Sequence, residues 1–195
     1  MKRKQIVPLA FLATSLGSFA QGLNVTANVG AVSSSAKNEK TTIGGFLGAG
    51  YEFGVGKNFY VGPQLRLNYE EFKQKGATTY GTFYSQYSTS LHALATYKIP
   101  VGEALSLNIN AGPYAQYAIF GRTHTSVKDG GKAPELGWWH SDFGGKFTYG
   151  LTAGVGLEIG GKWRVMFDYK QALKKTDMTH GGNANALSVG VGYSF

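Results

Sequence analysis

Hydrophobic residues fall on alternate positions through most of the chain. The first such run reads Leu23, Val25, Ala27, Val29 and Ala31, with polar or small residues at the positions between them. A period of two residues is typical of a β-strand with one apolar and one polar face. Further runs with the same period cover residues 43–53, 59–69, 83–99, 105–119, 147–159, 163–169 and 187–195. The pattern therefore predicts an all-β protein with eight strands.

The connections between these runs alternate in length. They are short around residues 56–57, 100–103 and 160–161, and longer around 34–40, 71–82, 121–145 and 174–183. Short periplasmic turns, long external loops and an even number of strands are typical of bacterial outer-membrane barrels. The sequence thus predicts an eight-stranded antiparallel up-and-down transmembrane β-barrel, with both chain ends on the short-turn side.

Aromatic residues decide which face of the predicted barrel meets lipid. A soluble lipocalin-like barrel or a sandwich would also alternate, but with the apolar face turned inward. Here aromatic residues gather at both ends of the apolar face, as in the two girdles that bracket a lipid-facing aliphatic band. We therefore expect the odd-numbered positions to face lipid in all eight strands. The predicted girdle consists of Tyr51, Phe53, Phe59, Tyr69, Tyr97, Tyr117, Phe147, Trp163 and Tyr169.

The opposite face carries many charged residues. This face is too charged for a dry core, so we expect it to line the barrel interior, which eight strands leave just wide enough for side chains to fill. Buried ions must be paired, and we hypothesise that ion pairs plug the bore. The predicted network comprises Glu52, Lys98, Glu158 and Arg164 near the short-turn end, Arg66, His92 and Asp168 nearer mid-height, and Glu70 and Lys170.

The first twenty residues are typical of a secretory signal peptide. Lys2, Arg3 and Lys4 precede an apolar stretch from Ile6 to Leu16, and 18–20 place small residues where a signal peptidase reads them. The alternative is a membrane anchor, but the apolar stretch is shorter than the ~20 residues that a helical span needs. We expect cleavage after Ala20 and a barrel domain at 21–195.

Composition excludes several other classes of protein. The chain has no cysteine, and its net charge is +8. Without Lys2, Arg3 and Lys4, sixteen basic and eleven acidic residues leave +5, spread without a basic helix, so we expect no nucleic-acid partner. His124, His140 and His180 fall on different loops without ligand spacing. We therefore expect no metal and no cofactor.

Several segments resemble a known family. These are Gly112-Pro113-Tyr114 to Gly121, the run Phe147 to Gly160 and the terminal Tyr193-Ser194-Phe195. The mature chain resembles the small outer-membrane β-barrel or "porin family" proteins common in Bacteroidota, akin to OmpX and the barrel part of OmpA. The resemblance implies that Val191, Tyr193 and Phe195 form a signal for the barrel-assembly machinery.

Two functions follow as expectations. The first is a non-enzymatic outer-membrane protein that supports envelope integrity, contacts lipid and lipopolysaccharide, passes small solutes at most, and offers Trp138 and Trp139 on its longest loop to an external partner. The alternative is a lipid A-modifying enzyme, a deacylase or acyltransferase, because such enzymes share this architecture. His92 lies near Ser88 and Ser90, but we expect same-strand neighbours not to be arranged as nucleophile and base, and predict no catalytic site.

Overall fold

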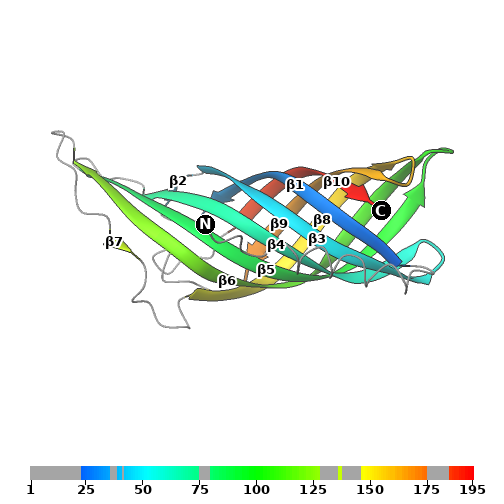
Figure 1. The fold of residues 1–195 in the computed structure, drawn as a ribbon, viewed down its shortest axis with the longest axis horizontal. Coiled ribbons are helices and arrows are strands. Elements are labelled where there is room, and N and C mark those ends of the chain that lie inside the picture. Colours follow the sequence, from blue (N-terminus) through cyan, green and yellow to red (C-terminus); the bar gives the residue numbers. More distant parts are fainter. Residues whose placement is uncertain are drawn as a thin grey trace, which may run out of the picture.

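Eight long antiparallel strands close into a barrel in the computed structural model, which describes residues 23–35, 39–40, 42–74, 80–127, 136–137, 146–174 and 185–195. Each long strand pairs with the next along the chain, and the last pairs back with the first (Figure 1). The predicted fold class is therefore confirmed. The long strands are β1 (Leu23–Ser35), β3 (Thr42–Gly56), β4 (Phe59–Gln74), β5 (Tyr80–Pro100), β6 (Leu105–Val127), β8 (Phe147–Ile159), β9 (Trp163–Ala172) and β10 (Asn185–Ser194).

Three strands continue well beyond the predicted runs. Residues 71–74, 80–82 and 121–127 were expected in loops, yet they extend β4, β5 and β6 as a paired ladder. The short strands β2 (Glu39–Lys40) and β7 (Leu136–Gly137) pair with β4 and β6 in this extension. The expectation was wrong because it relied on apolar alternation, whereas the backbone hydrogen bonds of a ladder form whatever the side chains are.

Side chains at odd positions point outward and those at even positions point inward. In β10, for example, Leu187, Val189 and Val191 are exposed, and the residues between them are buried. Two register shifts interrupt this rule. One lies at the short-turn end of β3, whose pairing with β4 jumps from Gly54↔Tyr60 to Gly56↔Phe59. The other lies in β6. The pairing of β5 with β6 jumps from Tyr87↔Phe120 to Ser88↔Ala118, so β6 holds one extra residue there. The expectation that odd positions face outward in every strand is therefore wrong beyond this β-bulge, which shifts the alternation by one residue.

The short connections contain the few backbone conformations that require special residues. Asn58 has a φ of 63° in the turn between β3 and β4, and Gly160 and Gly161 have φ values of 61° and 68° between β8 and β9. Positive φ is easily reached by glycine and tolerated by asparagine. These residues allow tight reversals at this end of the barrel, which we call the short-turn end.

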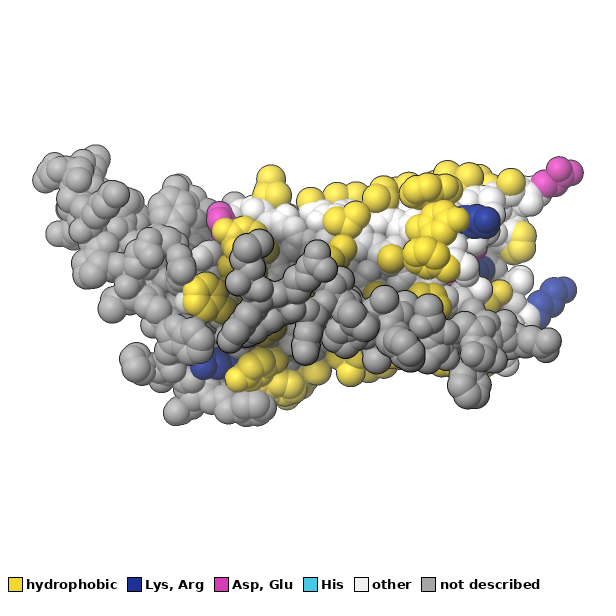
Figure 2. Space-filling model, in the orientation of Figure 1, with side chains coloured by type: hydrophobic (Ala, Val, Ile, Leu, Met, Phe, Trp, Pro, Cys, Tyr) yellow, Lys and Arg dark blue, Asp and Glu magenta, His cyan; other side chains and the backbone are white. Residues whose placement is uncertain are grey.

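The outward surface is almost entirely apolar. Figure 2 shows hydrophobic side chains spread along the visible wall of the barrel, with charged side chains towards its ends. Leu47, Leu67, Leu91, Leu151 and Val155 are each about half exposed. Among the described residues there is no helix long and apolar enough to span a membrane.

Candidate functional site: the polar interior of the barrel

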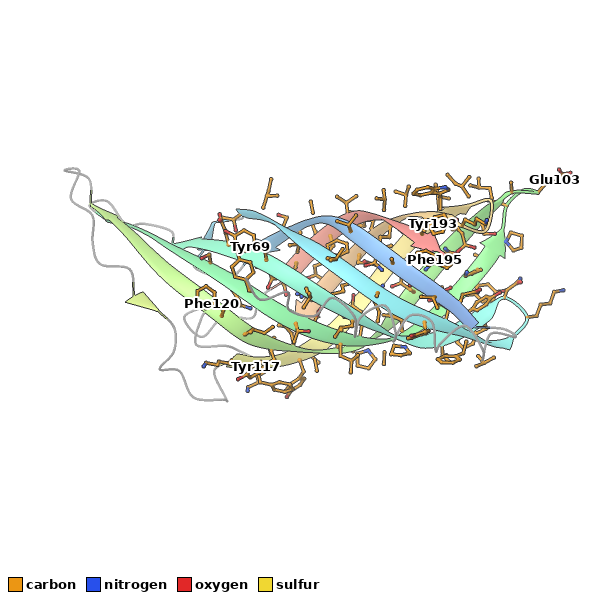
Figure 3. The ribbon with its side chains drawn as sticks, in the orientation of Figure 1. Tyr69, Glu103, Tyr117, Phe120, Tyr193 and Phe195 are labelled. Atoms are coloured by element: carbon orange, nitrogen blue, oxygen red, sulfur yellow. The ribbon has the colours of Figure 1, made fainter. Side chains whose placement is uncertain are left out.

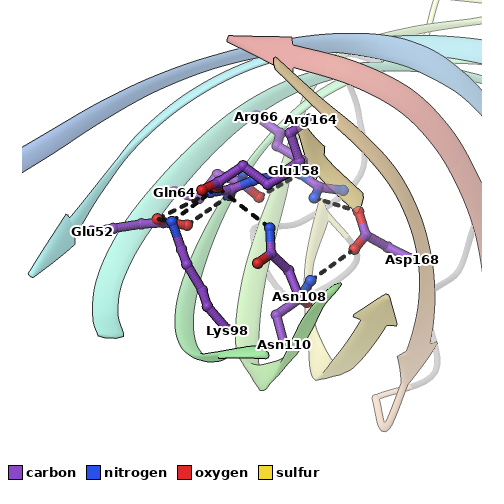
Figure 4. A network of polar contacts seen from close by, with 9 residues as sticks. All are labelled: Glu52, Gln64, Arg66, Lys98, Asn108, Asn110, Glu158, Arg164 and Asp168. Carbon is purple, nitrogen blue, oxygen red and sulfur yellow. Dashed lines mark hydrogen bonds and ion pairs between the residues drawn. The ribbon is translucent and has the colours of Figure 1, made fainter. Parts of the chain in front are cut away.

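Four charged side chains meet across the barrel near the short-turn end, and we call them the basal tetrad: Glu52, Lys98, Glu158 and Arg164. The Arg164 guanidinium binds both oxygens of Glu52, at 2.6 and 3.0 Å, and also Glu158 Oε2 at 2.7 Å. Lys98 Nζ lies 3.0 Å from Glu52 Oε2 and 2.9 Å from Glu158 Oε2. Each cation thus bridges two carboxylates that project from opposite strands, β3 and β8 (Figure 4).

The ion pair of Arg66 and Asp168 crosses the barrel next to the basal tetrad, and we call it the central pair. Arg66 Nη2 donates to Asp168 Oδ2 at 2.6 Å, and both side chains are buried. Arg66 Nε donates to Gln64 Oε1 at 2.7 Å, and its guanidinium carbon lies 4.9 Å from the centre of the Phe46 ring. Because β4 and β9 are four strands apart in either direction around the barrel, this pair spans the full bore.

A neutral polar layer lies on β4 and β5 beside this pair. Asn68 Nδ2 donates to Ser90 Oγ at 3.0 Å, Ser90 Oγ lies 3.0 Å from His92 Nε2, and the His92 ring stacks on Tyr114 at 5.4 Å. We expected Ser90 and His92 not to be arranged as nucleophile and base, but their side chains lie within hydrogen-bond distance of each other, so that expectation is wrong for the distance between Ser90 Oγ and His92 Nε2. However, both are 1% exposed, and His92 Nδ1 has no hydrogen-bond partner among the described residues. The carboxylate that would orient a catalytic histidine is therefore missing from this part of the chain.

Glu70 organises a cluster nearer the long-loop end. Its carboxylate accepts hydrogen bonds from Ser34 Oγ at 3.0 Å, Gln116 Nε2 at 2.9 Å and Lys170 Nζ at 3.2 Å. Lys170 Nζ also donates to Gln116 Oε1 at 2.6 Å. Like the central pair, Glu70 and Lys170 join β4 to β9 across the bore.

The described interior is electrically balanced. The carboxylates of Glu52, Glu70, Glu158 and Asp168 face an equal number of cations, which are Arg66, Lys98, Arg164 and Lys170. Every one of these ions is paired, as burial of charge requires. The structure thus brings the sequence-predicted network residues together in two charged clusters with the central pair between them, while His92 joins the neutral layer.

The outward face ends in aromatic side chains at both rims. The structure places every residue of the predicted girdle on this face, where Phe53, Tyr97 and Trp163 are about half exposed. The ring centres of Trp163 and Tyr193 are 5.1 Å apart, and those of Tyr69 and Tyr87 are 4.9 Å apart. In Figure 3, Tyr69, Tyr117 and Phe120 lie towards one end of the barrel and Tyr193 and Phe195 towards the other.

The spacing of the two rims fits a bilayer. Tyr69 follows Phe59 by ten positions along β4. Ten residues of strand are about 33 Å long, which a tilt of about 45° reduces to about 23 Å along the barrel axis. The apolar band of outer-membrane barrels is about 25 Å tall.

The sequence of this chain matches the family described as outer membrane protein beta-barrel domain over residues 6–195. The chain belongs to this family. Its apolar outward face is therefore the surface in contact with lipid, and its location is the bacterial outer membrane.

Solved barrels are similar to the chain at low sequence identity. Ail, the attachment invasion locus protein of Yersinia pestis, is 13% identical, with 88% of this chain and 98% of that chain covered and a TM-score of 0.45. Neisserial surface protein A is 13% identical, with 90% and 98% covered and a TM-score of 0.49. The outer membrane enzyme PagL is 15% identical, with 88% and 98% covered and a TM-score of 0.46. No curated protein matches the chain.

Sequence reasoning missed several residues of the interior. Phe46, Gln64, Tyr114 and Gln116 contact its charged groups or its histidine, and Asn68 donates a hydrogen bond to Ser90. Each of these residues has an even number, whereas the apolar residues of the same strands have odd numbers. Even-numbered side chains face the interior whatever their chemistry, so the residue number was the available signal. Phe120 was missed on the outward rim because the bulge reverses that parity. Several predicted features lie outside the described residues. They are the proposed signal peptide, the loop residues Trp138, Trp139, His140 and His180, and the side chain of His124.

Proposed function

We propose that this protein is a non-enzymatic outer-membrane barrel that supports envelope integrity, has a bore closed to all but the smallest solutes, and displays loops at the cell surface. The observation that carries the proposal is the basal tetrad, in which two cations each bridge two carboxylates from opposite walls. An ion that enters from the short-turn end would have to separate these contacts, and doing so would leave buried charges unpaired.

The conductance of the purified protein in planar bilayers tests the closed bore. The unaltered protein should give rare, small currents that vanish on dilution. Replacing Arg164 by alanine should raise the conductance and favour cations, because Glu52 and Glu158 would then line the bore with Lys98 alone to neutralise them. Lys162→Ala, a change in the adjacent exposed turn, should leave the conductance unchanged. High conductance of the unaltered protein that persists in dilute samples would overturn the closed bore.

A deletion strain tests the physiological part of the proposal. Loss of the gene should increase sensitivity to detergent, and expression of the protein should restore resistance. The lipid A of the deletion strain should have an unchanged mass, because Ser90 and His92 point into the interior, away from the lipid that a deacylase or acyltransferase must reach. If the deletion strain instead lacked an acyl modification that the lipid A of the parent strain shows, the result would favour the enzyme.

The remaining assignments belong to the same proposal. We infer that the mature chain begins at Gln21, which N-terminal sequencing of the membrane fraction would test. We also infer that Val191, Tyr193 and Phe195 are read by the barrel-assembly machinery. The outward positions of Val191 and Tyr193 on β10 and of Phe195 directly after it support this. Trp138 and Trp139 are proposed to contact lipopolysaccharide or a surface partner. Deletion of residues 130–141 should abolish that contact without changing the amount of protein in the membrane.

A further inference from the structure

Two lysines lie where β8 and β9 reach the long-loop rim of the barrel. Lys146 directly precedes β8, and Lys174 follows β9 by two positions. Leu173 lies ten positions after Trp163, the same step that separates the two rims on β4. Leu173 is therefore at the edge of the apolar band, and Lys174 lies just beyond that edge. The polar headgroups of a bilayer begin at this depth.

Lys174 is held against the wall of the barrel. The backbone N–H groups of Leu173 and Lys174 both donate to the Tyr149 carbonyl oxygen, at 2.9 and 3.4 Å. Thr148 Oγ1 donates to the Lys174 carbonyl oxygen at 3.2 Å, so the end of β9 is tied to β8. Lys174 Nζ lies 5.5 Å from the centre of the Phe147 ring, which is a cation–π contact. The ammonium group is thus positioned beside a residue of the aromatic girdle.

An apolar surface continues from the two lysines towards the middle of the bilayer. Tyr149, Leu151 and Leu173 lie on the outward face and are each about half exposed. The ring centres of Phe147 and Tyr149 are 6.3 Å apart, and Tyr117 pairs with Phe147 in the ladder. Figure 3 places Tyr117 towards this end of the barrel, and Figure 2 shows a basic side chain beside hydrophobic ones there. A cation above an apolar wall suits an amphiphile with an anionic head and acyl chains.

The two positive charges select the kind of headgroup. A long lysine side chain packs its stem on apolar surface and directs its ammonium group towards the polar headgroups. A phosphate accepts charge-assisted hydrogen bonds from such a group. An ammonium carries three donors, so it can bind a phosphate oxygen in addition to groups that it already contacts. A zwitterionic headgroup also brings a cation, which Lys146 and Lys174 would repel, so a phosphorylated headgroup without a cation fits better.

We propose that the rim at the ends of β8 and β9 binds a phosphorylated, anionic lipid of the outer leaflet. The phosphate contacts Lys174 and Lys146, and an acyl chain lies over Tyr149 and Leu151. The outer leaflet is the relevant one because the long loops of outer-membrane barrels face the exterior. The inference deepens the lipid contact of the proposed function by naming the headgroup and the residues. It rests on the outer-membrane location, and it depends neither on the closed bore nor on the loop tryptophans.

The test uses the whole mature protein refolded in detergent micelles, with diphosphoryl lipid A as the probe. Native mass spectrometry measures the affinity for this probe and for fully dephosphorylated lipid A with the same acyl chains. The unaltered protein should bind the phosphorylated probe more tightly. Lys174→Gln should weaken binding of the phosphorylated probe about fivefold, the effect of one cation at a membrane surface, and should leave the dephosphorylated probe unaffected. Lys174→Arg keeps the charge and should bind like the unaltered protein.

Lys162→Gln is the matched control. Lys162 is an exposed cation in the turn between β8 and β9, at the opposite end of the same strand pair. Its loss changes the net charge by the same amount and should leave binding of the phosphorylated probe unchanged. Adding Lys146→Gln to Lys174→Gln should weaken binding further. The gel shift between unheated and boiled samples shows that each variant is folded.

Three outcomes would overturn the lipid site. The first is equal affinity of the unaltered protein for the two probes, a comparison that needs no variant to fold. The second is an equal effect of Lys174→Gln and Lys162→Gln, because the attraction would then reflect net charge alone. The third is displacement of the phosphorylated probe by inorganic phosphate, which would make this a site for free phosphate. None of these outcomes bears on the conductance or on the detergent sensitivity of the deletion strain, so this inference and the proposed function can fail separately.

Discussion

Replacing Asp168 by asparagine should destabilise the barrel by about 3 kcal/mol. The change preserves the shape of the side chain but leaves the Arg66 guanidinium buried without its counter-ion. Removing one partner of a buried ion pair costs about 3–5 kcal/mol. We expect the lower part of that range, because Arg66 keeps its 2.7 Å hydrogen bond to Gln64 and its contact with the Phe46 ring. Losing the weak 3.5 Å contact between Asp168 and Asn110 should add little to this loss of stability.

Removing the cation instead should cost at least as much. Arg66→Met takes away the counter-ion of Asp168 and the donor to Gln64 in one step, so we expect a loss of about 4 kcal/mol. Each of these values is a large share of the roughly 5–15 kcal/mol by which a folded protein is stable. The double variant carries no buried unpaired charge, and it should lose about 3 kcal/mol less than the sum of the two single changes.

Urea unfolding of the protein refolded in lipid vesicles measures these differences. Trp163 lies on the outward face with 60% of its surface exposed. In a Trp138→Phe, Trp139→Phe background it is the remaining tryptophan, so its fluorescence there reports the departure of the barrel wall from the bilayer. Transition slopes that agree between variants are needed for the comparison. Glu103→Gln, in the exposed turn between β5 and β6, is the charge-removal control and should change stability by less than about 0.5 kcal/mol. Strictly additive single and double variants would refute the reasoning, because the two ions would then not interact.

Three further predictions concern the barrel wall. Gly44→Ala should severely reduce folding yield, measured by the gel shift of unheated samples, because a Cβ there would lie 1.9 Å from the Tyr69 carbonyl oxygen. Gly45→Ala should fold normally, since its nearest contact would be at 3.5 Å. Leu65→Arg, near the middle of the lipid-facing band, should lower the free energy of unfolding in vesicles by about 2–4 kcal/mol. Val101 is similarly exposed but lies beyond the band, and Val101→Arg should lower it by about 0–1 kcal/mol. Equal losses would contradict the assigned membrane depth. Deleting Phe195 should lower the amount of protein in the outer membrane of cells while leaving its refolding in detergent unchanged, and a parallel loss in both would point to a structural role alone.

The sequence predicted the barrel well because one rule governs most of it. A side chain in a strand faces either lipid or the interior, so the parity of a residue number predicts its environment. Burial of Glu52, Arg66 and Asp168 followed from their even positions. The rule failed beyond Ile119, where the bulge adds a residue and turns Phe120 outward. No sequence signal marks that bulge, because Ile119 and Phe120 are both apolar and suit either register.

The partners within the interior could not be predicted in the same way. Parity and strand order place Glu52, Glu158 and Arg164 near one end of the bore, but several pairings of nearby ions satisfy that placement. The observed tetrad depends on strand tilt and stagger, which bring β3 and β8 side chains to the same height. The Ser90–His92 contact was likewise missed, since the distance between neighbours two apart on a strand depends on the rotamers that surrounding side chains permit.

The order of charges along β4 and β9 also helps to fix the register of the barrel. On β4 the cation Arg66 precedes the anion Glu70, and on β9 the anion Asp168 precedes the cation Lys170. The pairs Arg66–Asp168 and Glu70–Lys170 both cross the bore, with opposite polarity. A slip of one wall along the other would bring Arg66 towards Lys170 or Glu70 towards Asp168, where like charges would face each other without water to screen them. Hydrophobic alternation cannot prevent a slip of two residues, because every side chain then keeps its face. The alternating charges oppose such a slip, which gives the ion pairs a role in specificity that their modest net contribution to stability would not reveal.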